Sequence, residues 1–115
     1  MMNSEKKSEP FVFSEEIAWE TTDKGVERKI LSYNKDLMMV HVRFQKGGIG
    51  KLHHHPHRQI SFIVEGTFEV EIDGQKKILN KGDSFIVEAD LVHGVVALED
   101  AAILDIFTPF REDFL

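Results

Sequence analysis

The stretch HHHPHRQISFIVEG, residues 53–66, joins a histidine cluster to a segment rich in β-branched and aromatic residues. His53 and His55 are two residues apart, so on an extended chain their side chains share one face, roughly 6–7 Å apart at the backbone. Two imidazoles at that spacing can bind one metal ion. Pro56 interrupts regular pairing, which allows the chain to turn and bring Gln59 toward the same ion. The stretch therefore predicts strand structure beside a metal site.

The two-residue period of a β-strand recurs along the chain. In DLMMVHVRF, residues 36–44, valine and phenylalanine alternate with methionine, histidine and arginine. The segment GTFEVEIDGQKKIL, residues 66–79, is typical of a hairpin whose turn is Asp73-Gly74. The other predicted elements are a strand over 59–66, a turn at 81–83 before a strand over 84–87, and two strands around Glu99-Asp100.

We expect about seven to nine short strands with turns at roughly 8–12-residue spacing, and no long helix with an apolar stripe. This pattern predicts an all-β domain, either an antiparallel sandwich or a closed barrel. An immunoglobulin-like sandwich is disfavoured, because histidines occupy mid-chain strands where that fold needs apolar residues.

The 115 residues suffice for one domain. We expect a flexible N-terminal tail over 1–10 and a single domain over 11–115. The opening is polar, and no later apolar run approaches the roughly 20 residues of a spanning helix, so we expect a cytoplasmic protein with no membrane partner. A net charge of −6 and the absence of long basic runs argue against nucleic-acid binding. Without cysteine, the chain has no thiolate ligand and no disulfide.

The spacing of Gly47, His53, His55, Gln59 and Gly66 resembles the first motif of the cupin superfamily, with the glutamine where the family more often has glutamate. The second cupin motif is matched at Gly82 and His93 and departs at Glu88, Asp90 and Ala97. The resemblance implies a small single-domain cupin, a double-stranded β-helix or jelly-roll barrel. Its implied metal ligands are His53, His55, Gln59 and His93.

Two plainer interpretations of the cluster stay open: a solvated loop, or a barrel that has kept its histidines without a metal. His57 and Arg58 are expected at the surface or the cavity mouth, since nothing in the sequence pairs them with a second element. His41 is expected to be a strand histidine with hydrogen-bond partners, with a cavity-lining position as the alternative.

The glutamine matters for the chemistry of the predicted site. Three neutral imidazoles and a neutral amide leave a divalent ion its full charge, which favours polarising an acidic substrate over activating dioxygen. The ion would also supply a positive centre in an acidic protein. Zinc, nickel, iron, manganese and copper all stay open.

The C-terminal stretch AAILDIFTPFREDFL places Asp105 in an apolar strand, where a carboxylate is costly unless it is paired or faces a cavity. Two-residue periodicity puts Phe107 on the same face. Pro109 then turns the chain, so that Arg111 can fold back over both residues. A structural Asp105–Arg111 ion pair is an equally weighted alternative.

Three stretches, HHHPHRQISFIVEG, DLVHGVVALED and LDIFTPFRED, together resemble the KdgF-type pectin degradation protein family. The resemblance implies an enzyme that converts 4,5-unsaturated monouronates from pectin and alginate breakdown into the linear ketonised sugar acid. It implies that Asp105, Phe107 and Arg111 are catalytic or contact the substrate. It also implies a homodimer, with the FVF segment at 11–13 as a candidate for exchange between subunits.

Two other functions stay open on the same barrel. One is a cupin dioxygenase or another metal-dependent redox enzyme, which would require dioxygen. The other is a non-catalytic sugar-binding cupin, which would bind uronates without changing them.

Overall fold

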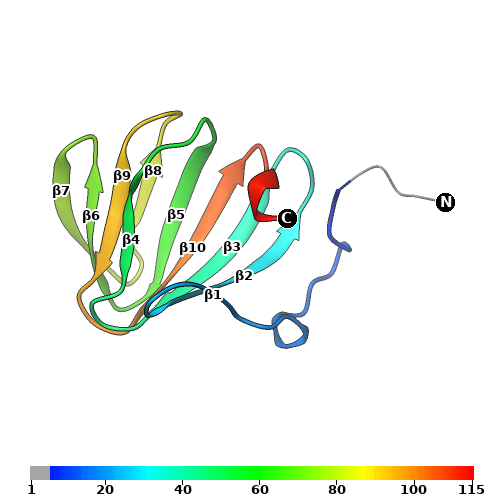
Figure 1. Cartoon of the computed structure of the whole chain (residues 1–115), viewed down its shortest axis with the longest axis horizontal. Coiled ribbons are helices and arrows are strands. Elements are labelled where there is room, and N and C mark those ends of the chain that lie inside the picture. The colour runs from blue at the N-terminus through cyan, green and yellow to red at the C-terminus, as the bar shows by residue number, and fades with distance from the viewer. Residues whose placement is uncertain (1–5) are drawn as a thin grey trace.

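The computed structural model describes residues 6–115, which form two antiparallel β-sheets that face each other (Figure 1). One sheet has six strands in the order β1-β2-β3-β10-β5-β8, and the other has four in the order β4-β9-β6-β7. The strands are β1 (Glu20–Asp23), β2 (Val26–Tyr33), β3 (Met38–Phe44), β4 (Ile49–His53), β5 (Arg58–Glu65), β6 (Thr67–Ile72), β7 (Gln75–Asn80), β8 (Ser84–Val87), β9 (His93–Ala97) and β10 (Ala101–Thr108). The predicted all-β architecture is confirmed.

The predicted strands and turns lie where the sequence pattern put them. Asp73 and Gly74 have φ values of 50° and 81°, the left-handed conformations that a two-residue hairpin turn needs. The described residues contain ten strands, more than the expected number. The strands without a predicted range are β1, β2 and β4. The four residues of β1 are all exposed, so it lacks the apolar alternation by which strands are found. Helical structure among residues 6–115 is limited to two 3-10 turns, η1 (Ser14–Glu16) and η2 (Glu112–Phe114).

The hydrophobic core lies between the two sheets. Phe44 of β3 and Phe68 of β6 meet edge to face, with ring centroids 5.0 Å apart. The residues buried around them are Val26, Ile63, Val70, Ala97, Ala101 and Ile103. A second, smaller cluster of Met38, Val40 and Phe107 is covered by side chains of the C-terminal segment. Between these clusters the sheets leave room for an internal cavity.

Gly66 connects the two sheets where β5 passes into β6. Its φ is +73°, and a Cβ atom there would lie 2.5 Å from the carbonyl oxygen of Asp100. Only glycine fits both the conformation and the space. This explains why the stretch 53–66 ends with a glycine.

The segment before β1 runs outside the sheets and extends away from them (Figure 1). Within it, the backbone N–H of Ser8 donates to the carbonyl of Tyr33 at 2.9 Å, and Lys6 pairs with Glu112 at 3.1 Å. Residues 1–5 of the predicted tail lie outside the described residues, and the domain boundary after residue 10 stays a prediction. No helix in residues 6–115 has the length and apolarity needed to cross a membrane.

Candidate metal centre and cavity

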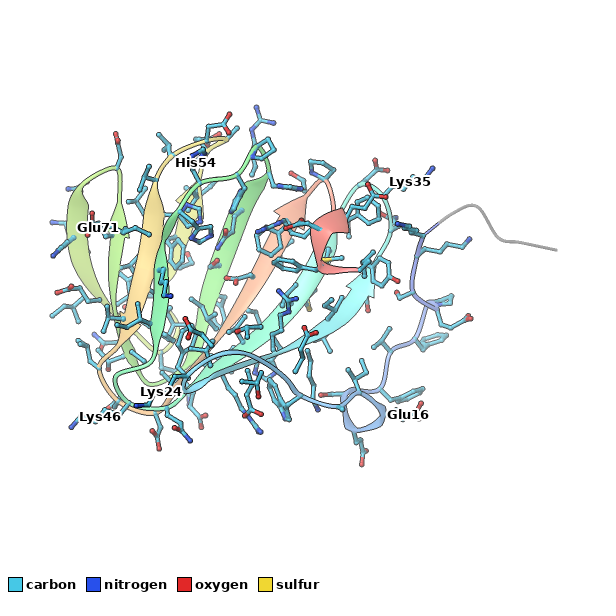
Figure 2. The ribbon with its side chains drawn as sticks, in the orientation of Figure 1. Glu16, Lys24, Lys35, Lys46, His54 and Glu71 are labelled. Atoms are coloured by element: carbon cyan, nitrogen blue, oxygen red, sulfur yellow. The ribbon has the colours of Figure 1, made fainter. Side chains whose placement is uncertain are left out.

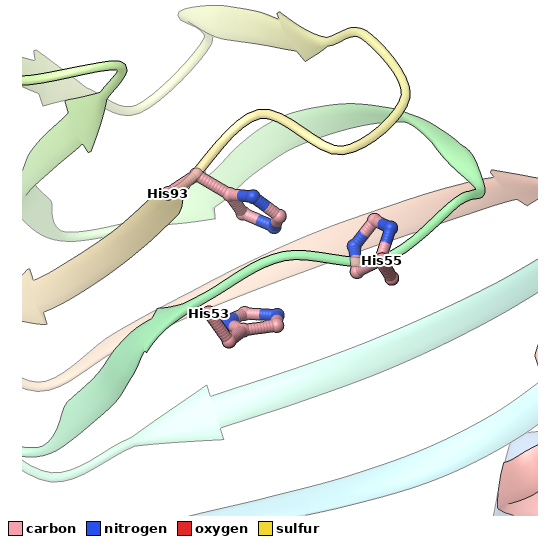
Figure 3. Close-up of side chains that lie close together, drawn as sticks. All are labelled: His53, His55 and His93. Atoms are coloured by element: carbon pink, nitrogen blue, oxygen red, sulfur yellow. The ribbon is translucent and has the colours of Figure 1, made fainter.

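Three histidines from two neighbouring strands converge on one point (Figure 3). His53 ends β4 and pairs in register with His93, the first residue of β9, while His55 follows on the loop after β4. One nitrogen from each ring lies within 4.8 Å of the others, a grouping suited to a metal ion. His54 between them is exposed, at the end of the molecule opposite Lys24 and Lys46 (Figure 2). Strand spacing predicted that His53 and His55 converge, and the cupin resemblance implied His93 as their partner. His54 is exposed because alternate residues of an extended chain point to opposite sides.

Each of the three imidazoles is held by a backbone carbonyl. A carbonyl oxygen only accepts, so the Nδ1 atom facing it must carry the proton, and Nε2 keeps a free lone pair. The Nδ1 atoms of His53, His55 and His93 donate to the carbonyls of Lys51, His57 and Leu91 at 2.7, 3.0 and 2.9 Å. The Nε2 atom of His93 is buried and has no hydrogen-bond partner among residues 6–115. Outer contacts of this kind orient the ligands of metal sites.

Gln59 completes the set from β5. Its amide nitrogen donates to Ser61 Oγ at 2.9 Å and to Asp105 Oδ1 at 3.2 Å, which directs Oε1 toward His55. Oε1 lies 3.1 Å from His55 Nε2, so two lone-pair acceptors face each other. A cation between them would bind both and remove their repulsion. The donor set therefore fits a metal ion.

The protonation states also suit metal binding. Burial is the largest cause that lowers the pKa of His93 to about 4. Burial also lowers the pKa of His55, followed by the nearby charge of Arg111. Both rings are therefore neutral at pH 7, which is the form that binds metals.

Asp105 on β10 lies on the cavity wall beside this cluster. Its Oδ1 atom accepts a hydrogen bond from Ser61 Oγ at 2.6 Å as well as the one from Gln59. Oδ2 accepts none from the described residues. Burial raises the pKa of Asp105 to about 6, although the hydrogen bonds and Arg111 oppose the rise. A carboxyl group with this pKa can accept and donate protons near neutral pH.

The two sheets line an open cavity of about 180 Å³. Its walls include most of the residues that the sequence singled out, namely His53, Gln59, His93, Asp105, Phe107 and Arg111. Arg28 of β2 and Phe114 of η2, which the sequence did not identify, also line it. One small space thus combines imidazole nitrogens, a titratable carboxyl group and two guanidinium groups.

Arg111 folds back as expected, but it does not form the ion pair with Asp105 that the sequence left open as an alternative. Its Nε and Nη2 donate to Asp113 at 3.1 and 2.9 Å, so its partner is Asp113 and not Asp105. The guanidinium carbon lies 5.0 Å from the Phe107 ring centroid and 4.2 Å from that of Phe114. The acidic group that balances Arg111 therefore lies outside the cavity wall, on η2.

The structure corrects the interpretation of His57. It is half-buried, and its Nε2 lies 3.1 Å from the carbonyl oxygen of Phe110, so it does pair with a second element. Arg58 is exposed as expected and pairs with Glu88 at 3.3 Å. His41 is absent from the cavity wall and packs against Trp19, with ring centroids 5.1 Å apart.

The backbone conformation at Asp90 explains how the chain tolerates one departure from the second cupin motif. It has a φ of +66°, a conformation favoured by the glycine that the motif has there and tolerated by aspartate. Its backbone N–H donates to the carbonyl of His55 at 2.8 Å. The substitution thus keeps a turn that supports the histidine loop.

Comparisons with known proteins agree with this architecture. The cupin domain model matches residues 40–107. The pectin degradation protein KdgF of Dickeya dadantii (strain 3937) is 45% identical over 107 residues, which span 91% of this chain and 97% of that protein. A structure of KdgF from Halomonas sp. matches with TM-score 0.90 and 41% identity over 94% of this chain and 100% of that chain. An RmlC-like cupin from Shewanella frigidimarina NCIMB 400 matches with TM-score 0.92 and 42% identity over 95% and 98% of the two chains.

Proposed function

This chain belongs to the cupin family, among the KdgF-type pectin degradation proteins, and from that membership we propose that it converts 4,5-unsaturated monouronates into linear ketonised sugar acids. The main support is the shared cavity, whose wall holds two of the three clustered histidines, a carboxyl group with pKa about 6 and Arg111. At about 180 Å³ the cavity is smaller than typical drug-sized sites of roughly 300–1,000 Å³. It therefore suits one sugar ring better than an oligosaccharide.

We propose one divalent metal ion per subunit, held by His53, His55, His93 and Gln59 Oε1. Imidazole-rich sets suit zinc, nickel and iron, and manganese stays open. When bound, such an ion supplies Lewis acidity that stabilises negative charge on a substrate oxygen. Because all four ligands are neutral, none of them reduces that charge.

The proposed reaction is an isomerisation. The C4=C5 bond of the substrate makes the ring oxygen part of an enol ether. A proton leaves the anomeric hydroxyl, the bond from C1 to the ring oxygen breaks, and C1 becomes an aldehyde. The ring oxygen stays on C5, a proton is added to C4, and C5 becomes a ketone. One proton is removed and one added, so atoms and charge balance.

Asp105 is the proposed proton carrier. Ser61 and Gln59 hold its Oδ1, so Oδ2 is the atom available to the cavity. With its pKa near 6, the ionised carboxylate can take the proton of the anomeric hydroxyl, and the resulting carboxylic acid can donate to C4. The same residue can therefore perform both transfers.

Phe107 and Arg111 are proposed to position the sugar. Phe107 is 3% exposed and lines the cavity, where its ring can pack on the apolar face of the sugar. Arg111 keeps Nη1 free of the hydrogen bonds to Asp113, and its charge favours a monoanionic ligand.

The test follows loss of the C4=C5 absorbance when the metal-loaded protein meets an unsaturated monouronate in the absence of air. We expect acceleration over the spontaneous rate, loss of turnover in Asp105→Ala and His93→Ala, and normal turnover in Asp36→Ala, which replaces an exposed aspartate. A rate that depends on dioxygen would support the redox alternative. Saturable binding with no acceleration would support the non-catalytic one.

We further propose a homodimer that uses the FVF segment. Phe11 and Phe13 are 81% and 61% exposed. They belong to the segment before β1, which runs outside the sheets (Figure 1). Exposed aromatic side chains of this kind mark interaction sites. Light scattering should give a dimer mass that a Phe11→Ser/Phe13→Ser double variant loses, and a wild-type monomer would contradict the proposal. The cytoplasmic location stays a prediction of the sequence.

A further inference from the structure

Arg28 is the one cavity residue with a full charge that has no place in the mechanism above. It lies on β2 opposite Val42 of β3, whose side chain also lines the cavity. Its guanidinium carbon lies 3.9 Å from the ring centroid of Phe114, and its side chain is 19% exposed. The guanidinium groups of Arg28 and Arg111 therefore both lie against the ring of Phe114 at the cavity wall.

The two arginines differ in which of their donors are occupied. Arg111 uses Nε and Nη2, one complete edge of its guanidinium, for the two hydrogen bonds to Asp113. Arg28 uses only Nε, which donates to Glu20 at 2.7 Å. Neither Nη group of Arg28 hydrogen bonds to a described residue, so the edge formed by Nη1 and Nη2 is free. That edge matches a carboxylate with two parallel hydrogen bonds.

We propose that Arg28 is a substrate-binding residue whose free edge binds the carboxylate of the monouronate. The inference rests on the proposed function for the identity of the ligand. Glu20 holds the Nε side of the group, and the Phe114 ring limits its movement, so the guanidinium is fixed before the ligand arrives. Arg111 then adds charge and a donor from Nη1. The sugar carboxylate is thus the group that determines how the ring lies relative to Asp105.

Arg43 on the neighbouring strand offers a closely matched control. Its Nε donates to Glu27 at 2.9 Å, and its guanidinium carbon lies 4.0 Å from the Trp19 ring centroid. These contacts repeat those of Arg28 with Glu20 and Phe114, but Arg43 does not line the cavity. Replacing either arginine with glutamine removes one ion pair and one cation–aromatic contact, and only Arg28→Gln changes the cavity.

The experiment measures the affinity of the metal-loaded wild type, Arg28→Gln, Arg28→Lys and Arg43→Gln for galacturonate, a saturated uronate that does not react, by calorimetry. The steady-state kinetics of the same four proteins are also measured with the unsaturated monouronate and with its methyl ester. We expect Arg28→Gln to weaken Kd and raise KM about 10- to 100-fold, the loss typical of a charge-assisted hydrogen-bonded pair. Arg28→Lys should recover part of the loss, since it keeps the charge without the two-donor edge. Arg43→Gln should stay within about twofold of wild type, and the methyl ester should show no difference between wild type and Arg28→Gln.

Wild-type affinity and KM in Arg28→Gln would overturn the inference, as would an equal loss with the methyl ester, which would indicate contact with another part of the sugar. Failure of the proposed function gives a different result. In that case the wild type does not accelerate ring opening, while the calorimetric comparison of Arg28→Gln with Arg43→Gln still decides whether Arg28 binds a uronate carboxylate.

Discussion

Replacing Asp105 with asparagine should stabilise the metal-free protein and abolish its turnover once metal is restored. Burial raises the pKa of Asp105 from an ordinary 3.8 to about 6. At about 1.4 kcal/mol for each tenfold change in the ionisation equilibrium, the ionised side chain lowers the free energy of unfolding by about 3 kcal/mol at pH 8. Asparagine keeps an oxygen that accepts from Ser61 and carries no charge. We therefore expect the variant to gain up to about 3 kcal/mol at pH 8.

The gain in the free energy of unfolding should be larger at high pH than at low pH. The folded-state pKa lies above the unfolded one, so between about pH 4 and pH 6 the folded protein holds a proton that the unfolded chain releases. The wild type therefore loses stability as pH rises through this range. At pH 5 the advantage of Asp105→Asn should shrink to about 1.5 kcal/mol.

Urea unfolding of the EDTA-treated proteins at pH 5 and pH 8, followed by circular dichroism, measures both values. Asp36→Asn, which replaces an exposed aspartate, should match the wild type at either pH. A variant that is less stable than the wild type at pH 8, or an advantage that is the same at both pH values, would refute the reasoning. Normal turnover of metal-loaded Asp105→Asn would refute the proposed proton transfer.

Further predictions concern the ligands and their supports. Ser61→Ala should lower the free energy of unfolding by about 1–3 kcal/mol and weaken metal binding about 10- to 100-fold, because Asp105 and Gln59 each lose a hydrogen-bond partner. The control Ser84→Ala, which replaces an exposed serine, should change neither quantity. Nickel or zinc at 100 times its Kd should raise the wild-type free energy of unfolding by about 2.7 kcal/mol, and His93→Ala should show no such gain in thermal melts with and without EDTA. Gly66→Ala should lower the free energy of unfolding in urea by about 1–3 kcal/mol or more, because the new Cβ atom would lie 2.5 Å from a carbonyl oxygen and the φ of the residue is +73°. A urea midpoint equal to that of the wild type would contradict this steric account.

Most strands and the pairing of His53 with His55 could be predicted because they depend on short-range geometry, whereas His93 was implied by the cupin resemblance. The two-residue period of a strand decides which side chains share a face, so it put His53 beside His55 and Asp105 beside Phe107. The same period on β5 places Ser61 on the face of Gln59, and it could have identified the serine. Ser61 was not predicted because only charged, aromatic and imidazole side chains on that face were considered.

The remaining parts of the site depend on contacts between segments far apart in the chain. Arg28 faces the cavity because β2 pairs with β3, and nothing in its local sequence distinguishes it from Arg43. His57 contacts Phe110 across 53 positions, a contact that depends on where the chain packs after β10. The pair of Arg111 with Asp113 is local in sequence, but whether Arg111 pairs with Asp113 or with Asp105 depends on the same packing.

Regular sheet structure ends at Thr108, yet Arg111 and Phe114 lie beyond it, within the last few residues before Leu115. The core clusters around Phe68 and Met38 are built mainly from strands that precede this segment. Residues 109–115 thus have two roles: Phe110 and Phe114 cover the smaller core cluster, and Arg111 and Phe114 line the cavity. The cluster around Phe68 includes none of them, so changes at Arg111 should alter the cavity while leaving the larger core intact.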